Sequence, residues 1–503
     1  MKAPATSGFH RTTIEPVFAC LRVVISKTRA RSASRETLAF SSLRGRFCIV
    51  RMIGAVNGEA RRAVSRSPPR RKVLVGFRHW DQCISHGAHA SGTKRPATGI
   101  FMTDKTPRMD LSHLDWPFFD RDHRAFAPEF ETWASGRLRE FEPDEGGDGV
   151  AARKIFELLA QSGWLQKTLM TQPSSRDRPK IDLRSVCLLR EVCAYSSAMA
   201  DVALSEPWLG ILPIALYASP ELRENLLPRY LSGRLLPAFA LSEPGAGSDA
   251  AAITTTARLD GNHYVINGRK TWTSNSGLAD IYIVFARIDG HEGSTGISAF
   301  AIDGNDSGMT LDQRLSVLPP HTVGTWSLRD VRVPTDRLIG EPGGGFKIAM
   351  NVLELFRPTV GAATLGLARR AMEEAIAHSV ARTAFRKPIS EHQLVQAKLA
   401  DMAVSVDASA LLVYRAAWQH DQGGKGIARE AAIAKYFSTE RAFEVIDQAV
   451  QIFGGLGVLK GTTVERLFRH SRAFRIFDGT SEIQQLIIAR DMLKGRDGGK
   501  TLL

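Results

Sequence analysis

The sequence predicts an α+β fold in which a helical block, a β block and a second helical block follow one another. Three observations predict it. Residues 114–230 show apolar side chains at three- and four-residue spacing, residues 237–340 show short alternating runs, and residues 345–494 return to long helical patterns. At 503 residues, the chain has room for about two to four domains.

The first segment, residues 1–101, differs in composition from everything after it. It holds 19 Lys and Arg against four Asp and Glu, whereas the remainder carries a net charge of −1 out of a total of +14. No helical or strand period persists in it. We interpret it as a disordered leader or an over-extended reading frame upstream of a start at Met102. A transit peptide and a basic binding tail are the alternatives.

Composition also excludes several functional classes. The balanced charge after residue 101 leaves no polyanion-binding footprint, so we expect no nucleic-acid partner. The sequence contains no run of about 18 apolar residues, so we expect no membrane-spanning helix. The five cysteines form no CxxC pair, which excludes a disulfide scaffold and gives no metal site.

The three blocks after the leader each have a local signature. In the N-terminal helical domain, 102–236, amphipathic patterns cover Arg153–Trp164 and Val186–Leu204. In the middle domain, 237–340, two β runs flank Asp260-Gly261, which predicts a hairpin. In the C-terminal domain, 341–495, a pattern of more than six turns without Pro or Gly predicts a helical bundle, most simply of four helices.

Two long motifs go beyond periodicity. They are FALSEPGAGSDAAAITTTA at Phe239–Ala257 and QIFGGLGVLKGTTVERLFRHSRAFRIFDGTSEIQQLIIAR at Gln451–Arg490. Further matching segments are Arg269–Gly277, Leu355–Ala371 and Arg382–Met402. Together they resemble the acyl-CoA dehydrogenase family over about residues 110–495.

This resemblance implies an N-terminal helical domain, a middle β-barrel and a C-terminal four-helix bundle, arranged as a homotetramer or a dimer. It also implies an FAD-dependent oxidoreductase of acyl-CoA catabolism that acts on CH–CH groups. A base removes the α-proton of an acyl-CoA thioester and flavin N5 accepts the β-hydride. Electrons would then pass to an electron-transferring flavoprotein.

The resemblance also assigns the cofactor site. Residues that would contact the flavin are Phe239, Leu241, Ser242, Gly247, Ser248, Trp272 and Ser274, with Trp272 stacking beside the ring and Ser274 supplying a hydroxyl near N5. Residues that would reach the FAD of a neighbouring subunit are Arg382, Phe385, His392, Gln393, Gln451, Phe453, Gly454 and Gly455. Thr480 and Glu482 complete the cofactor set.

Substrate contacts follow from the same resemblance. Ser248, Glu354, Arg357 and Gly479 would contact the CoA thioester. Asp201 falls on the helix that lines the acyl pocket. There it would recognise a polar acyl chain or share proton transfer, unless it is simply an exposed helix acid.

This sequence differs from the family pattern at the position of the catalytic base. Its usual position is a Glu before GTS, which is Asp478 in IFDGTSEIQ; the other family position is Phe356, which cannot accept a proton. Asp478 is one methylene shorter than Glu. Three explanations stay open: a substrate whose α-carbon sits closer, as in a cyclic or branched acyl group, a related reaction such as that of nitroalkane oxidase, or a weakened dehydrogenase.

Two other functions compete with the dehydrogenase. A flavin oxidase or monooxygenase of the nitroalkane oxidase type would need no CoA, but Gln485 stands where that enzyme has an Arg. A non-catalytic flavoprotein associated with nucleic acid would need a basic C-terminal surface. A start at Met102 predicts a bacterial cytoplasmic enzyme, whereas a genuine transit segment predicts the mitochondrial matrix.

Overall fold

The computed structural model describes residues 39–41, 47–49, 108–141, 149–170, 177–289, 293–319, 321–424 and 426–494. The chain separates into two compact units, Met1–Ile100 and Phe101–Leu503. In the first unit, strands β1 (Ala39–Ser41) and β2 (Phe47–Ile49) pair antiparallel. The rest of the predicted leader lies outside the described residues.

The second unit begins with helices, as the apolar spacing predicts. They are α1 (Arg121–Arg137), α2 (Val150–Gln161), α3 (Leu183–Ser196), α4 (Ala198–Tyr217) and α5 (Pro220–Leu231). Ser197 separates α3 from α4 because its backbone is extended, with φ −160°. The two helices therefore pack against each other instead of forming one rod.

Helix α4 is apolar on nearly every side. Its length and hydropathy would suit a membrane span, but 83% of its most apolar window is buried inside the protein. A helix that is hydrophobic all round is expected at the centre of a large core. Its packing against β3 and α6 places α4 between the sheet and the long C-terminal helices of the second unit.

A mixed eight-stranded sheet follows the helices. Its strands are β3 (Pro237–Ala240), β4 (Thr256–Asp260), β5 (His263–Ser274), β6 (Ile281–Ile288), β7 (Ile297–Asp303), β8 (Met309–Leu315), β9 (Val323–Pro334) and β10 (Leu338–Ile339). The order is β10-β7-β6-β4-β5-β9-β8, with β3 parallel to β6. The hairpin predicted at Asp260-Gly261 is confirmed, with Asp260 opposite His263.

The strands β6 and β7 are buried on both faces, against different cores. Along β6, Ile283 and its alternate neighbours join the helical core, whereas Tyr282 and its alternate neighbours join a core enclosed by the sheet itself. In that second core the ring of Tyr282 meets Trp326 of β9 at 4.9 Å, although β6 and β9 are not adjacent strands. The sheet must therefore curl around its own side chains.

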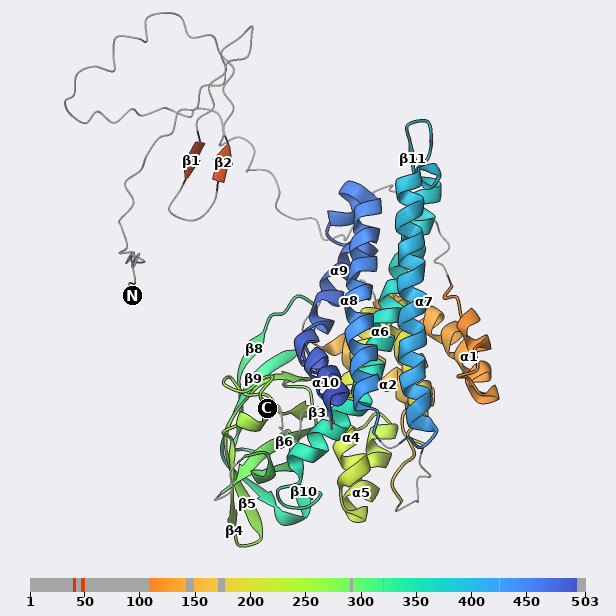
Figure 1. Cartoon of the computed structure of the whole chain (residues 1–503). Coiled ribbons are helices and arrows are strands. Elements are labelled where there is room, and N and C mark those ends of the chain that lie inside the picture. The colour runs from red at the N-terminus through yellow and green to blue at the C-terminus, as the bar shows by residue number, and fades with distance from the viewer. Residues whose placement is uncertain are drawn as a thin grey trace, which may run out of the picture. The chain divides into compact units, whose positions relative to one another are not determined.

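The C-terminal helices form an upright bundle beside the sheet (Figure 1). They are α6 (Gly345–Ala381), α7 (Gln393–Asp421), α8 (Ala428–Phe453), α9 (Thr463–Phe474) and α10 (Ser481–Leu493). The three long helices pack pairwise, and α9 and α10 pack on α8. Helix α3 approaches α6 closely because Gly366 has no side chain: a Cβ there would lie 2.1 Å from the carbonyl oxygen of Glu191. The α+β prediction is confirmed in its order of blocks.

Candidate active site

Asp478 lies in the turn between α9 and α10, in a strained backbone conformation. Its φ is +57°, which a residue with a Cβ rarely adopts, and Gly479 follows with φ +94°. Thr480 then caps α10, its hydroxyl accepting from the amide of Ile483 at 3.4 Å. Such strain persists only where the surroundings fix it, and it concentrates at functional sites.

Three side chains bond the two carbonyl groups of this turn. Lys435 Nζ donates to the Gly479 oxygen at 2.8 Å, and Gln484 Nε2 donates to the same oxygen at 2.9 Å. Arg357 Nε approaches the Asp478 carbonyl oxygen at 3.5 Å. Among the described residues, no hydrogen bond takes up the Asp478 carboxylate. These hydrogen bonds fix the main chain of the turn, whereas the Asp478 carboxylate remains available to accept a proton.

The ionisation of Asp478 suits a proton acceptor. Burial raises the pKa of Asp478 to about 7, and the charge of Glu206 adds to the rise, while Lys435, Arg190 and Arg357 oppose it. Burial likewise lowers the pKa of Lys435 to about 8. A general base works best when its pKa lies near the operating pH, so the proton affinity of Asp478 is that of a proton acceptor suited to neutral pH.

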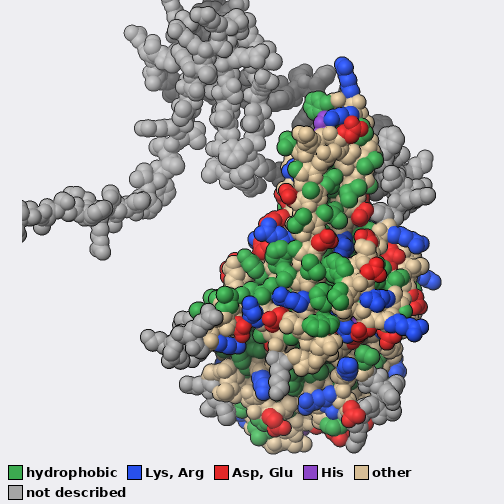
Figure 2. Space-filling model, turned by 45° about the vertical axis from the view of Figure 1, so that its right-hand side comes forward, with side chains coloured by type: hydrophobic (Ala, Val, Ile, Leu, Met, Phe, Trp, Pro, Cys, Tyr) green, Lys and Arg blue, Asp and Glu red, His purple; other side chains and the backbone are tan. Residues whose placement is uncertain are grey.

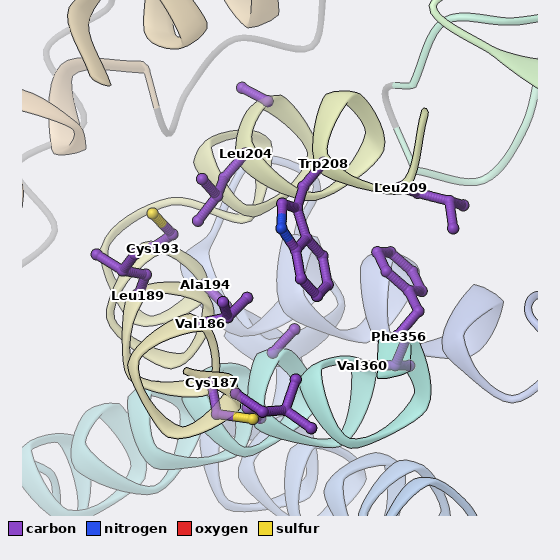
Figure 3. Packing of buried hydrophobic residues seen from close by; sticks show 14 of the residues in the cluster. Val186, Cys187, Leu189, Cys193, Ala194, Leu204, Trp208, Leu209, Phe356 and Val360 are labelled. Atoms are coloured by element: carbon purple, nitrogen blue, oxygen red, sulfur yellow. The ribbon is translucent and has the colours of Figure 1, made fainter. Parts of the chain in front are cut away.

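Phe356, at the other family position for a base, forms part of the apolar wall. Its ring is fully buried, packs against Trp208 of α4 with centroids 5.8 Å apart, and lies 4.8 Å below the guanidinium of Arg190. Figure 3 shows Phe356 and Trp208 together in this apolar cluster. No second acid is present at this position.

Asp201 is fully buried, so the alternative of an exposed helix acid is wrong. Its two carboxylate oxygens accept from Arg190 Nε at 2.7 Å and Nη2 at 2.8 Å, and Arg190 Nη1 donates to Thr359 Oγ1 at 2.9 Å. This bidentate pair links α3, α4 and α6. The Asp201 carboxylate, which was expected to recognise a polar acyl chain or to share proton transfer, is therefore already paired with Arg190.

The first motif forms a tight turn held by a buried ion pair. Glu243 and Ala246 exchange main-chain hydrogen bonds of 2.9 and 3.0 Å. The Glu243 carboxylate accepts from Lys270 Nζ at 2.7 Å, and Lys270 also donates to the Leu241 carbonyl at 3.1 Å. Burial alone would raise the pKa of Glu243, but Lys270 and the hydrogen bonds of Thr255 and Thr254 lower it to about 2. The pair fixes the turn against β5.

A bulge in β5 turns Trp272 outward beside this turn. The register of β5 with β9 shifts between Lys270 and Thr273, Trp272 has φ +57°, and its side chain is 61% exposed. The amide of Thr271 donates to the Ser242 carbonyl at 2.9 Å, which joins the bulge to the motif. An exposed indole next to a small-residue turn fits one face of a flat aromatic cofactor.

The residues that were predicted to reach the FAD of a neighbouring subunit lie on parts of the surface other than the one around Trp272. Phe385 is 90% exposed at the tip of the hairpin β11 (Thr383–Ala384) and β12 (Lys387–Pro388), and its ring meets the edge of His392 at 5.9 Å. This hairpin stands at the end of the bundle away from the sheet (Figure 1). Phe453 stacks on His378 at 4.2 Å.

The other predicted site residues differ in how far they are exposed to solvent. The exposed ones are Gly247, Ser248, Arg382, Gln393, Gln451, Gly454, Gly455 and Glu482; the half-buried ones are Phe239, Ser242, Ser274, Glu354 and Thr480; the buried ones are Leu241 and Arg357. Glu354 Oε1 accepts from the amide of Ile427 at 2.6 Å and so holds the start of α8. Gln485 donates to Tyr436 Oη at 2.9 Å.

Three charged residues of the site were not singled out from the sequence. Arg190 and Lys435 are charged residues whose side chains are buried in α3 and α8, and Glu206 is a half-buried acid of α4. A charge at a core-facing position is unusual unless it is paired, and that is the signal that would have found Arg190 and Lys435. Among the described residues, no group of His, Cys, Asp and Glu could hold a metal ion.

Two segments of the chain match known protein families, and the chain as a whole is similar to known proteins. Residues 238–329 match the family described as acyl-CoA dehydrogenase, middle domain, and residues 343–493 match acyl-CoA dehydrogenase, C-terminal domain. The chain is 35% identical over 382 residues to 3-(aryl)acrylate reductase of Clostridium sporogenes, an alignment covering 75% of this chain and all of that protein.

A second relative and a solved structure are also similar to the chain. Cyclohexane-1-carbonyl-CoA dehydrogenase of Geobacter metallireducens is 38% identical over 344 residues, covering 68% of this chain and 89% of that protein. The structure of acyl-CoA dehydrogenase complexed with FAD from Bacillus anthracis superposes with a TM-score of 0.69 at 31% identity, covering 76% of this chain and 68% of that one.

Proposed function

The chain belongs to the acyl-CoA dehydrogenase family, and on that premise we propose that it removes hydrogens from Cα and Cβ of an acyl-CoA thioester with Asp478 as the base. It is an oxidoreductase acting on CH–CH bonds, and FAD is its cofactor. The observation that carries the proposal is the Asp478 turn. Its carboxylate accepts no hydrogen bond from the residues that the structure describes, its pKa is raised to about 7, and its backbone is strained and hydrogen-bonded.

The residues of the chain fit FAD. The exposed indole of Trp272, the turn from Leu241 to Ser248 and the hydroxyl of Ser274 would hold the flavin ring, since they join a flat apolar surface to a polar group. FAD supplies the two-electron acceptor for the β-hydrogen. The protein supplies position: Asp478 would take the proton from Cα while the wall of Phe356 and Trp208 excludes water from the reacting carbons.

The proposed role of Asp478 explains the contacts around it. Because Asp is shorter than Glu, its carboxylate reaches less far from the main chain, and a placement error of about 1 Å costs on the order of 100-fold in rate. Lys435, Gln484 and Arg357 fix the main chain of the turn and so limit such errors. Lys435 is a positioning residue in this scheme.

We also infer a homo-oligomer. Within one chain, the hairpin β11–β12, which carries Phe385, stands at the end of the bundle away from the sheet, which carries Trp272 (Figure 1), so a second copy would bring both kinds of predicted residue to one FAD. Helix α7 carries exposed apolar side chains at seven-residue spacing, Val404, Leu411 and Trp418. Figure 2 shows apolar side chains among charged ones on the bundle. We also propose, as the family resemblance implies, a cytoplasmic enzyme that passes electrons to an electron-transferring flavoprotein.

The test is anaerobic titration of the FAD-loaded protein with acyl-CoA thioesters. A panel of straight, branched, arylacyl and cyclohexane-carboxyl thioesters is added while flavin absorbance near 450 nm is followed. We expect bleaching by at least one class, slower by about 10²–10⁴-fold in Asp478→Asn. Asp122→Asn, an exposed acid of α1, is the matched control and should behave as wild type. A flavin that no thioester bleaches would contradict the proposal.

A further inference from the structure

The turn that carries Asp478 is a closed loop from Arg475, at the end of α9, to Ser481, the first residue of α10. The amide of Ser481 donates to the Arg475 carbonyl at 3.1 Å, so the two ends of the loop meet. Asp478 lies midway between them and, like Gly479 after it, has a positive φ. This conformation is unfavourable for a residue with a Cβ, so the loop keeps it only while contacts around it hold the backbone.

Glu440 of α8 binds both ends of this loop. Its carboxylate accepts from Arg475 Nε at 2.9 Å and from Arg475 Nη2 at 2.6 Å, and it also accepts from the Ser481 hydroxyl. The guanidinium of Arg475 lies 5.1 Å from the ring centroid of Phe443, about one turn further along α8. A two-armed bond between an arginine and a carboxylate fixes distance and orientation together. Glu440 therefore reinforces the hydrogen bond between the ends of the loop.

The Glu440 contacts differ in kind from those at the centre of the loop. Lys435 and Gln484 donate to the Gly479 carbonyl and so orient one peptide group. Glu440 instead holds the residues at which the loop begins and ends. Because Lys435 and Glu440 both belong to α8, one helix fixes the centre and the ends of the loop. The direction of a side chain depends on its backbone angles, so a loop that opens would redirect the Asp478 carboxylate.

We propose, on the basis of the proposed function, that Glu440 is a positioning residue for the base. By holding Arg475 and Ser481 together it keeps Asp478 in its left-handed backbone conformation, and so sets where the carboxylate meets the α-proton. A misplacement of about 1 Å costs on the order of 100-fold in rate. Loss of the Glu440 contacts should therefore slow proton removal and leave thioester binding nearly unchanged.

The first test measures the rate of flavin reduction by the FAD-loaded enzyme at saturating thioester, together with the Kd of that thioester. Glu440→Ala should lower the rate by about 10- to 100-fold and change the Kd by less than about threefold. Arg475→Met removes the same ion pair from the side of the loop and should have the same effect. Glu444→Ala is the matched control and should behave as wild type, since Glu444 is an exposed acid of α8 that pairs with Arg441.

A double-mutant cycle separates positioning from general support of the fold. Asp478→Asn has no carboxylate to position, so adding Glu440→Ala to it should change the remaining rate by less than about twofold. If Glu440→Ala lowers the rate by the same factor in wild type and in Asp478→Asn, Glu440 only supports the fold and the inference is overturned. FAD content and thermal midpoint identify the folded variants, and Arg475→Met takes the place of Glu440→Ala in the cycle if Glu440→Ala does not fold.

Amide deuterium exchange reports on the loop without any catalytic step. The Ser481 amide, which closes the loop, should exchange about 10-fold faster in Glu440→Ala and in Arg475→Met than in wild type, but not in Glu444→Ala. An exchange rate that none of these variants changes would show that Glu440 does not hold the loop closed, and would overturn the inference.

The outcomes also separate this inference from the proposed function. If a thioester reduces the flavin in wild type but only slowly in Asp478→Asn, while Glu440→Ala and Arg475→Met match wild type, the dehydrogenase stands and the role of Glu440 falls. If no thioester reduces the flavin in wild type, the proposed function falls, and the role of Glu440 in it falls as well.

Discussion

The exchange Lys435→Met is the most informative perturbation of the Asp478 turn. It removes a buried ammonium that bonds the Gly479 carbonyl at 2.8 Å and whose charge lowers the pKa of Asp478, and it keeps a side chain of similar length. Asp478 accepts a proton only when ionised, so the rate of flavin reduction should rise with pH through its pKa. Without the nearby positive charge the carboxylate is less acidic, and that rise must move to higher pH.

The size of this shift can be worked from Coulomb's law. Unit charges about 4–8 Å apart at an effective dielectric constant of about 20 interact by about 2–4 kcal/mol. At about 1.4 kcal/mol per pKa unit this corresponds to about 1.5–3 units. Because the pKa of Lys435 is itself lowered to about 8, its charge is partly lost over the same pH range, so a shift of about one to two units is expected. The midpoint should move from near 7 to about 8–9, so that the rate at pH 7 falls by about 5- to 50-fold and recovers at alkaline pH.

The assay is stopped-flow reduction of the flavin under anaerobic conditions, at saturating thioester from pH 5.5 to 9.5. Lys435→Arg retains the charge and should keep its midpoint near that of wild type. If Lys435→Met lowers the rate by one factor at every pH and leaves the midpoint unchanged, Lys435 only supports the fold and the electrostatic reasoning is refuted.

Three further predictions concern the buried groups around the site. Arg190→Met leaves the Asp201 carboxylate buried without its partner, so the free energy of unfolding should fall by about 3–5 kcal/mol in urea titrations; a variant as stable as wild type would contradict the pairing. Gly366→Ala places a Cβ 2.1 Å from the Glu191 oxygen and should cost about 1–3 kcal/mol or more, whereas Gly136→Ala, with open space around it, should not destabilise. Burial lowers the pKa of His321 to about 4, so the unfolded chain binds a proton that the folded chain refuses. Stability should drop by about 3 kcal/mol as the pH falls from about 6.5 to 4, less so in His321→Leu, and a urea midpoint that stays constant over this range would argue against it.

The sequence predicts the architecture well because its signals are local. Apolar spacing of three and four residues gives the helices, and the turn residues at Asp260-Gly261 give the hairpin. The α+β order of blocks therefore follows from periodicity alone. The position of Asp478 comes from a motif, since the residues around it, Gly479 and Thr480, shape one short turn before α10.

The rest of the site depends on distant pairs that no local pattern encodes. Lys435 meets the Asp478 turn because α8 packs on α10, and Arg190 meets Asp201 because the extended backbone of Ser197 folds α4 back on α3. The outward position of Trp272 depends on a register shift between two strands. Each of these follows from tertiary packing and is visible only in three dimensions.

The central claim is that the carboxylate of Asp478 takes the α-proton of an acyl-CoA thioester. Its most direct test is the exchange of the α-hydrogen with solvent deuterium, followed by mass spectrometry while the thioester is bound to the FAD-loaded enzyme. We expect exchange in wild type and in Asp122→Asn, and exchange slower by about 10²–10⁴-fold in Asp478→Asn that still binds the thioester. Exchange in Asp478→Asn at the wild-type rate would show that another group removes the α-proton.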